Sequence, residues 1–295
     1  MTTLRELLQD AANRLLEVGG AEDLDEARLE VELLYARAAG LDRVHVIAAG
    51  GQPPDPAAVE PFEALLVRRL AHEPLAYILG QREFYGLTFE VGEGALIPRP
   101  ETETLVEAGL AAIREHPRHR RLVRVADVGT GSGAVAIAVA HHEPTVKMFA
   151  IDSSTAALQW AGKNRRRLGP IERLVLLTGD LLDPLTEPLD VVLANLPYVP
   201  TEEFNALPEE IRTHEPALAV DGGEDGLDLY RRFAAQLPDH LVEDAYAVLI
   251  EIGAGQALFA QDILLDALGH PPAAEVRAHR DLRGIRRVIE VRVGY

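Results

Sequence analysis

The tetrapeptide Asn195-Leu196-Pro197-Tyr198 combines residue types that suit attack by a planar nitrogen on an electrophilic methyl group. The side-chain oxygen of Asn195 and the backbone carbonyl of Leu196 are hydrogen-bond acceptors. Acceptors aimed at the hydrogens of an amide or aromatic amine favour the positive charge that develops on its nitrogen. Pro197 stiffens the turn and removes a competing N–H, and Tyr198 supplies a ring on which a flat group can stack. The alternative is an ordinary turn at a strand end, where Asn and Pro are common.

A glycine-rich segment lies upstream, in the run Val125-Ala126-Asp127-Val128-Gly129-Thr130-Gly131-Ser132-Gly133. It follows an expected strand and opens an expected helix, where glycines permit tight turns and close approach of a ligand. The spacing Gly129-x-Gly131-x-x-Ala134 also satisfies a looser dinucleotide-binding pattern. The loop by itself therefore predicts only a nucleotide-like ligand.

Carboxylates end or follow the next expected strands. Asp152 can accept hydrogen bonds from ribose hydroxyls, or it can cap the following helix, a role that Ser153 or Ser154 can also fill. Asp180 can accept from an adenine amino group, with Leu181 packed on the ring, or it is a plain turn residue. A nicotinamide dehydrogenase shares the first carboxylate, but hydride transfer has no evident use for the tetrapeptide.

The elements that carry these residues alternate between strand and helix from about residue 122 onward. Expected strands are 123–128, 146–151, 174–178, 191–194, 247–252, 275–278 and 288–293, and expected helices are 133–141, 155–168, 227–236 and 256–268. Apolar strands joined by amphipathic helices predict an α/β fold with a parallel, doubly wound sheet. Only a loop, 280–286, separates the last two strands, so they are expected to pair antiparallel.

The N-terminal part of the chain has a helical pattern instead of alternating strands and helices. Apolar residues recur at helical spacing over residues 4–16 and 24–35, and a further helix is expected over 57–70. Residues 83–91 predict a short hairpin with Gly86 near its turn. The expected domains are a helical domain over 1–85, a hairpin and linker over 86–100, and the sheet domain over 101–295.

Composition limits the function further. The 29 Lys+Arg against 47 Asp+Glu give a net charge of −18, which disfavours stable binding of nucleic acid. Two basic clusters, 116–124 and 163–167, are expected to be solvated. The chain has no cysteine, and its ten histidines show no ligand spacing, so we expect no metal. No apolar run is long enough for a bilayer and no secretory signal is evident, so we expect no membrane association and a cytoplasmic protein.

Segments outside the glycine loop carry a family resemblance: Glu73 to Gly80 (EPLAYILG), Leu96 to Glu103 (LIPRPETE), Glu215 to Leu218 (EPAL) and Asp221 to Leu227 (DGGEDGL). With these, the chain resembles the glutamine-N5 methyltransferases that modify class-1 peptide chain release factors. The resemblance implies a seven-stranded, Rossmann-like methyltransferase sheet and a small helical N-terminal domain that helps hold the release factor. It also implies S-adenosylmethionine as cofactor, S-adenosylhomocysteine as product, and a substrate glutamine in a Gly-Gly-Gln loop.

Particular residues take roles through this resemblance. Cofactor contacts are expected from Gly129, Thr130, Gly131, Ser132, Gly133, Asp152, Asp180, Leu181 and Asn195. The glutamine is expected beside Asn195, Leu196, Pro197 and Tyr198, with Asn195, Pro197 and Tyr198 as the catalytic group. Arg99, held between prolines that bias the backbone toward extended geometry, is either a wall of the substrate pocket or a structural residue.

One position departs from the family pattern, which is usually Asn-Pro-Pro-Tyr. The expected contribution of position 196 is its backbone carbonyl, which Leu196 can supply. Asn-Leu-Pro-Tyr is more typical of ribosomal RNA adenine dimethyltransferases, so an adenine N6 methyltransferase acting on RNA or DNA is the alternative function. A protein that binds the cofactor without catalysis, and a nicotinamide dehydrogenase, are the remaining hypotheses.

Overall fold

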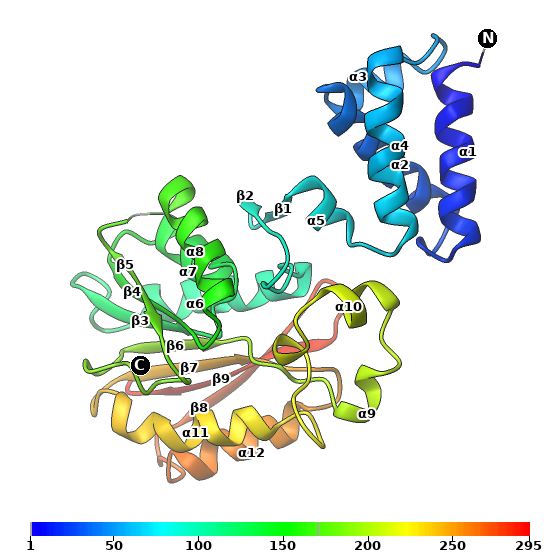
Figure 1. Cartoon of the computed structure of the whole chain (residues 1–295). Coiled ribbons are helices and arrows are strands. Elements are labelled where there is room, and N and C mark those ends of the chain that lie inside the picture. Colours follow the sequence, from blue (N-terminus) through cyan, green and yellow to red (C-terminus); the bar gives the residue numbers. More distant parts are fainter. Residues whose placement is uncertain (1, 170) are drawn as a thin grey trace. The chain divides into compact units, whose positions relative to one another are not determined.

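A computed structural model describes residues 2–169 and 171–295, and the chain divides into two compact units. A helical unit comprises the chain up to Gln81 together with 208–214, and a larger unit comprises 82–207 and 215–295. Both units are drawn in Figure 1. No helix in the described part of the chain combines the length and apolarity that crossing a bilayer requires.

The helical unit confirms the helical pattern that the sequence predicts. Its helices are α1 (Leu4–Glu17), α2 (Leu24–Ala39), α3 (Arg43–Ala48), α4 (Pro56–Leu70), α5 (Leu75–Leu79) and α10 (Glu209–His214). The first four begin after a Thr or Asp whose side chain accepts a hydrogen bond from the first turn, which satisfies otherwise unpaired backbone donors. Their apolar faces meet in a core that includes the fully buried Leu15, Leu34 and Phe62.

The larger unit contains a seven-stranded sheet in the order β5-β4-β3-β6-β7-β9-β8. Its strands are β3 (Val123–Val128), β4 (Val146–Asp152), β5 (Leu174–Thr178), β6 (Val191–Ala194), β7 (Tyr246–Glu251), β8 (Glu275–Arg280) and β9 (Arg286–Val293). The first five strands are parallel, and β9 pairs antiparallel with both β7 and β8. The predicted doubly wound sheet and its terminal antiparallel pair are therefore confirmed.

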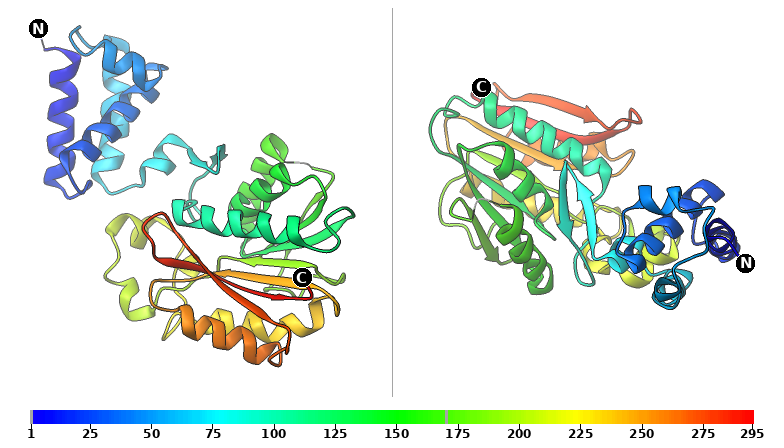
Figure 2. Two further views of the ribbon diagram at one scale, coloured as in Figure 1. Left: turned by 180° about the vertical axis from the view of Figure 1, so that it is seen from behind. Right: turned by 90° about the horizontal axis from the view of Figure 1, so that it is seen from above.

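Helices cover both faces of this sheet (Figures 1 and 2). One layer holds α6 (Glu103–Glu115), α7 (Ala134–His142) and α8 (Thr155–Leu168), and the other holds α11 (Asp228–His240) and α12 (Ala257–Ala267). Every residue of β6 and β7 is accordingly buried, as expected for strands covered on both sides. Helix α11 continues about one turn beyond its expected end and contains Pro238 in that last turn.

Shorter elements complete the larger unit. The hairpin predicted around Gly86 is present as β1 (Gln81–Phe84) and β2 (Leu87–Glu90). Tyr85 and Gly86 both have positive φ, 49° and 72°, which is the backbone geometry of a type I′ hairpin turn. The remaining short elements are η1 (Pro100–Thr102), α9 (Thr201–Phe204) and η2 (Ala217–Ala219).

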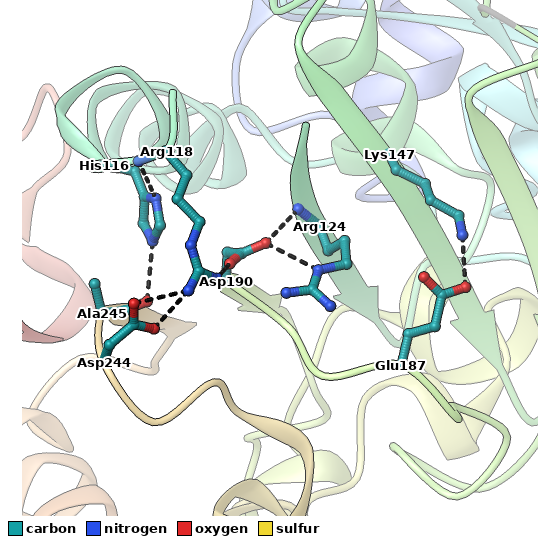
Figure 3. A network of polar contacts seen from close by, with 8 residues as sticks. All are labelled: His116, Arg118, Arg124, Lys147, Glu187, Asp190, Asp244 and Ala245. Atoms are coloured by element: carbon teal, nitrogen blue, oxygen red, sulfur yellow. Dashed lines mark hydrogen bonds and ion pairs between the residues drawn. The ribbon is translucent and has the colours of Figure 1, made fainter. Parts of the chain in front are cut away.

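A polar network lies near the amino ends of strands β3 and β6 (Figure 3). Asp190 precedes β6 and is fully buried. It accepts hydrogen bonds from Arg118 Nη1 at 2.7 Å and from the backbone N–H of Arg124 at 2.8 Å. Arg118 also bridges to Asp244 at 2.7 Å. The basic cluster at 116–124 was expected to be solvated. Two of its arginines, Arg118 and Arg124, instead form ion pairs within the fold.

Asp190→Ala is expected to destabilise the protein without weakening cofactor binding. Removing the carboxylate deprives the Arg118 and Arg124 side chains and the Arg124 backbone N–H of a buried acceptor. The cost is about 1–3 kcal/mol, because both arginines stay partly exposed to solvent and Arg118 keeps its ion pair with Asp244. Urea unfolding measures the loss of stability, and calorimetry of the folded variant measures cofactor affinity. An unchanged unfolding free energy would show that this network is not a stabilising one.

Candidate cofactor and acceptor site

A cavity of about 400 Å³ lies where β3, β4, β5 and β6 end. This is the carboxyl edge of the parallel strands, at the point where the strand order reverses around β3, and ligands of open α/β sheets bind there. The predicted residues that line the cavity are Gly129, Gly131, Asp152, Asp180, Leu181, Asn195, Leu196 and Pro197. The cavity is also lined by residues 94–96 and 153–157 and by Pro216, Leu218, Ala219 and Leu229. The fold thus gathers the ends of four separate strands around one cavity.

The glycine loop follows β3 and is fixed by backbone contacts to β4. The N–H groups of Gly129 and Thr130 both donate to the Ile151 carbonyl at 2.9 Å. Gly129 has φ +75°, and a Cβ there would lie 3.1 Å from the Leu196 side chain and 3.2 Å from the Asn195 carbonyl oxygen. Glycine is therefore required at position 129 both for its φ and for the close approach of the loop to the tetrapeptide.

Thr130, Ser132 and Gly133 do not line the cavity and instead build the loop. The Thr130 hydroxyl donates to Asp127 at 2.6 Å. The Ser132 carbonyl accepts from the buried Asn164 side chain at 2.9 Å, and a Cβ on Gly133 would press on Ala161 of α8. A direct contact of these three residues with a cofactor stays a prediction.

Asp127 is a site residue that the sequence analysis missed. Its carboxylate is buried inside β3 and accepts from Thr130 and from the backbone N–H of Ala136 at 3.0 Å. It therefore joins the strand end to the first turn of α7. Burial raises the pKa of Asp127 to about 6. The signal was an acidic residue flanked by apolar residues in the second half of the strand, a position that is rarely acidic unless its hydrogen bonds are satisfied.

Asp127→Asn is expected to gain stability relative to the wild type as pH rises. An acid whose pKa is raised by folding holds its proton more tightly in the folded state, so the wild type loses stability as pH increases between about 4 and 6. This pH-dependent loss of stability amounts to roughly 3 kcal/mol. The Asp127→Asn variant does not show it, because its amide does not titrate, and the amide oxygen still accepts from Thr130. Urea unfolding at several pH values measures the difference, with the exposed Asp239→Asn as control. A difference that does not change with pH would contradict this role.

Asp152 ends β4 with both carboxyl oxygens directed by the backbone. Oδ1 accepts from Ser154 N–H and Oδ2 from Gly131 N–H, each at 2.8 Å. Burial raises the pKa of Asp152, and these backbone hydrogen bonds oppose the rise. Ser154, not Asp152, caps α8, since its hydroxyl accepts from Ala157 N–H at 3.2 Å. The carboxylate is thus oriented at the cavity wall without serving as the helix cap.

The turn after β5 is held by α11. Asp180 forms an ion pair with Arg232 of that helix, and Gln236 accepts from Leu182 N–H at 2.8 Å. Leu181 is buried with φ +51°, an unfavourable backbone conformation for a leucine. The Arg232 and Gln236 contacts hold this turn in place, with Asp180 and Leu181 at the cavity. Sequence reasoning identified neither Arg232 nor Gln236.

The tetrapeptide follows β6 and is anchored by Tyr230 of α11. Leu196 N–H donates to the Tyr230 hydroxyl at 3.2 Å, and that hydroxyl lies 3.2 Å from the Leu196 carbonyl. The Tyr230 hydroxyl has one proton, and it lies closer to the Glu251 backbone carbonyl than to the Leu196 carbonyl. The Leu196 carbonyl therefore remains available to the target nitrogen. The Leu196 side chain is buried in the core between the sheet and α11. This apolar environment explains why leucine is accommodated at position 196.

Asn195 and Tyr198 are each tied to a buried residue. Asn195 Nδ2 donates to the Thr102 hydroxyl at 3.1 Å, and the Tyr198 hydroxyl lies 3.4 Å from Glu251 Oε1. Burial and the nearby Glu251 raise the pKa of Tyr198, so its phenol is neutral. Neither Thr102 nor Glu251 was anticipated from the sequence, because both come from segments far from the tetrapeptide.

Arg99 forms an ion pair with the buried Glu215, whose other oxygen accepts from Ile97 N–H at 3.0 Å. Glu215 thereby fixes the segment that carries Arg99, and Arg99 does not line the cavity. The structure gives Arg99 a structural partner, and its contact with substrate stays a prediction.

Comparison with known proteins gives matches along nearly the whole chain. Family models described as "PrmC N-terminal domain" and "Methyltransferase small domain" match residues 6–80 and 105–224. A relative from Geobacter sulfurreducens, called release factor glutamine methyltransferase, is 36% identical over 293 residues, covering 99% of this chain and 97% of that protein. A relative of the same name from Moorella thermoacetica is 41% identical, covering 88% of this chain and 89% of that protein.

Solved structures share the fold. The hMettl16 catalytic domain in complex with MAT2A 3'UTR hairpin 1 is 16% identical with a TM-score of 0.52, covering 82% of this chain and 81% of that chain. At this level of identity the likeness concerns the fold alone.

Proposed function

Since this chain belongs to the family of release factor glutamine methyltransferases, we propose that it methylates the side-chain amide nitrogen, N5, of the glutamine in the Gly-Gly-Gln loop of class-1 peptide chain release factors. One observation carries the proposal at the level of chemistry. Asn195 opens onto the same cavity as the glycine loop and Asp152. Acceptors for a reacting amide and a cradle for a nucleoside therefore belong to one site.

The residues present fit S-adenosylmethionine as the methyl donor. The cavity volume of about 400 Å³ lies in the range of small-ligand sites. Asp152 would accept from the ribose hydroxyls, Asp180 from the adenine amino group, and the apolar Leu181 would pack on the adenine. When bound, the cofactor supplies a methyl group on a positively charged sulfur.

The protein's own part is to orient the glutamine amide and stabilise its developing charge. Asn195 Oδ1 would accept from one N–H of that amide, and the Leu196 carbonyl from the other. Tyr198, tethered to Glu251, would stack on the planar amide. No general base is needed before attack, because the methylated nitrogen is acidic and loses its proton readily.

We propose further that the helical unit helps to hold the release factor, as the match of residues 6–80 to the family's N-terminal domain supports. The enzyme would meet the release factor in the cytoplasm, where release factors act on ribosomes. The net charge of −18 argues against a polyanionic substrate, so the adenine N6 alternative is not favoured.

The test is methyl incorporation from labelled S-adenosylmethionine into a release factor, the same factor with its loop glutamine changed to alanine, and bulk RNA. We expect label in the intact release factor alone. Label in RNA at low salt, with none in either protein, would overturn the proposal in favour of an adenine methyltransferase.

A further inference from the structure

We propose that Gln256 is a positioning residue for the reaction, and that it acts by holding Tyr198 where its ring meets the substrate amide. The inference rests on the proposed function and deepens it, because it concerns how the acceptor site is kept ready for the glutamine. It also assigns a task to the segment from Asp221 to Leu227, which stands out in the sequence but does not line the cavity.

The side-chain amide of Gln256 joins three backbone segments near the carboxyl ends of β6 and β7. Its Oε1 accepts from the N–H of Gly253, in the loop after β7, at 2.8 Å. Its Nε2 donates to the Tyr198 carbonyl at 2.9 Å and, more weakly, to the Asp225 carbonyl at 3.4 Å. A backbone N–H only donates and a carbonyl only accepts, so these partners fix which way the amide faces. Both ends of the Gln256 amide are therefore used within the fold.

The peptide group that follows Tyr198 is held at both of its ends. Its carbonyl accepts from Gln256, and its N–H, which belongs to Val199, donates to the Val220 carbonyl at 3.1 Å. The Val199 carbonyl in turn accepts from the N–H of Gly222 at 2.8 Å. The backbone direction at Tyr198 is thereby set by two segments that are distant in the sequence.

Glycines make room for this arrangement. Gly226 has φ +77°, and a Cβ there would clash with the Tyr198 carbonyl oxygen and lie 2.7 Å from Gln256 Nε2. A Cβ on Gly222 would lie 2.6 Å from the Pro197 carbonyl oxygen. A side chain at either position would push the tetrapeptide out of place. This glycine-rich segment is therefore shaped to lie against the carbonyls of Pro197, which lines the cavity, and of Tyr198.

The Tyr198 ring is held at its hydroxyl and along one edge. The hydroxyl lies 3.4 Å from Glu251 Oε1. A Cβ on Gly253 would lie 3.2 Å from Tyr198 Cδ2 and 2.9 Å from Gln256 Oε1, so this glycine borders both the ring and the amide that holds the backbone. One set of contacts thus fixes the backbone and the ring of Tyr198 before substrate arrives.

A holding role of this kind affects turnover more than cofactor affinity. Tyr198 is expected to align the flat glutamine amide with the methyl group, and a misplacement of about 1 Å can cost about 10²-fold in rate. The expected cofactor ligands Asp152 and Asp180 belong to the ends of β4 and β5, on the other side of β3 from the strands that Gln256 joins. A purely structural role would lower stability and leave kcat of the folded protein unchanged.

The first experiment measures kcat, KM for the release factor and cofactor affinity in Gln256→Met, with Gln261→Met on the same helix as the matched control. Methionine keeps the length of the side chain and lacks the amide that bridges the backbone segments. We expect kcat to fall about tenfold with KM and cofactor affinity near wild-type values, and the control to behave as the wild type. Wild-type kcat in Gln256→Met, or a cofactor affinity that falls together with kcat, would overturn the inference.

Two further variants separate positioning from a structural role. In a Tyr198→Ala background, Gln256→Met should lower kcat no further, because the ring that it holds is gone. Gly253→Ala disturbs the same contacts from the other side and should also lower kcat at unchanged cofactor affinity. Its control is Gly162→Ala, where a Cβ would have its nearest neighbour at 3.6 Å. Additive losses in the double variant, or wild-type kcat in Gly253→Ala, would overturn the inference.

A second readout does not depend on the substrate. With 3-fluorotyrosine incorporated, the ¹⁹F signal of Tyr198, assigned through Tyr198→Phe, should shift in Gln256→Met and in Gly253→Ala but not in Gln261→Met. An unchanged signal in the first two variants would overturn the inference. Failure of the proposed function would instead appear as absent methylation of the release factor while this shift persists.

Discussion

Replacing Asn195 with alanine is expected to lower kcat by about 10²–10³-fold while leaving the affinity for S-adenosylmethionine nearly unchanged. The Asn195 oxygen acts mainly as positive charge develops on the target nitrogen, so its loss raises the barrier more than it weakens ground-state binding. Thr102 holds the other end of the side-chain amide, which means that the oxygen is positioned before substrate arrives.

Single-turnover methylation of a release factor measures the loss of turnover in Asn195→Ala. Calorimetric titration measures its affinity for S-adenosylmethionine. Asn205→Ala, in an exposed turn after α9, is the matched control and should behave as the wild type. Equal losses of turnover and cofactor affinity in Asn195→Ala would mean that Asn195 is a cofactor ligand rather than the acceptor of the reacting amide.

Asp152→Ala is expected to produce the complementary result, with cofactor affinity weakened about 10–100-fold and a smaller loss of kcat at saturating cofactor. The substitution removes the expected acceptor for the ribose hydroxyls and the acceptor of Gly131 N–H, so the glycine loop also loses an anchor. Calorimetry measures the affinity, and Asp239→Ala, at an exposed position on α11, is the control. Wild-type affinity in Asp152→Ala would exclude the carboxylate from cofactor binding.

Much of the fold could be predicted because its strands are short apolar runs covered on both faces. Residues 123–128, 174–178 and 191–194 were bounded correctly by the ends of their apolar runs. Local pattern did not predict α10, a short helix with no buried residue. That α10 groups with the helical unit depends on tertiary contacts, such as Glu210 with Arg69 at 3.1 Å, that no periodicity encodes.

The cavity walls were predictable for a similar reason. Asp152, Asp180 and Asn195 each end or follow a parallel strand, and parallel strands end at one edge of the sheet. The residues that hold those walls, among them Thr102, Tyr230 and Arg232, come from distant segments and carry no local signal. Asp127 and Glu251 were the exceptions that could have been found, since each is an acid in an apolar strand. Position 196 was predicted through its carbonyl alone, and the hydrogen bond from its backbone N–H to the Tyr230 hydroxyl was not foreseen.

The most direct test of the central claim is tandem mass spectrometry of a class-1 release factor after incubation with the protein and S-adenosylmethionine. The account predicts one added methyl group on the side-chain amide of the glutamine in the Gly-Gly-Gln loop, present with wild-type protein and nearly absent with Asn195→Ala. A methyl group on any other residue, or the same yield from Asn195→Ala, would contradict it.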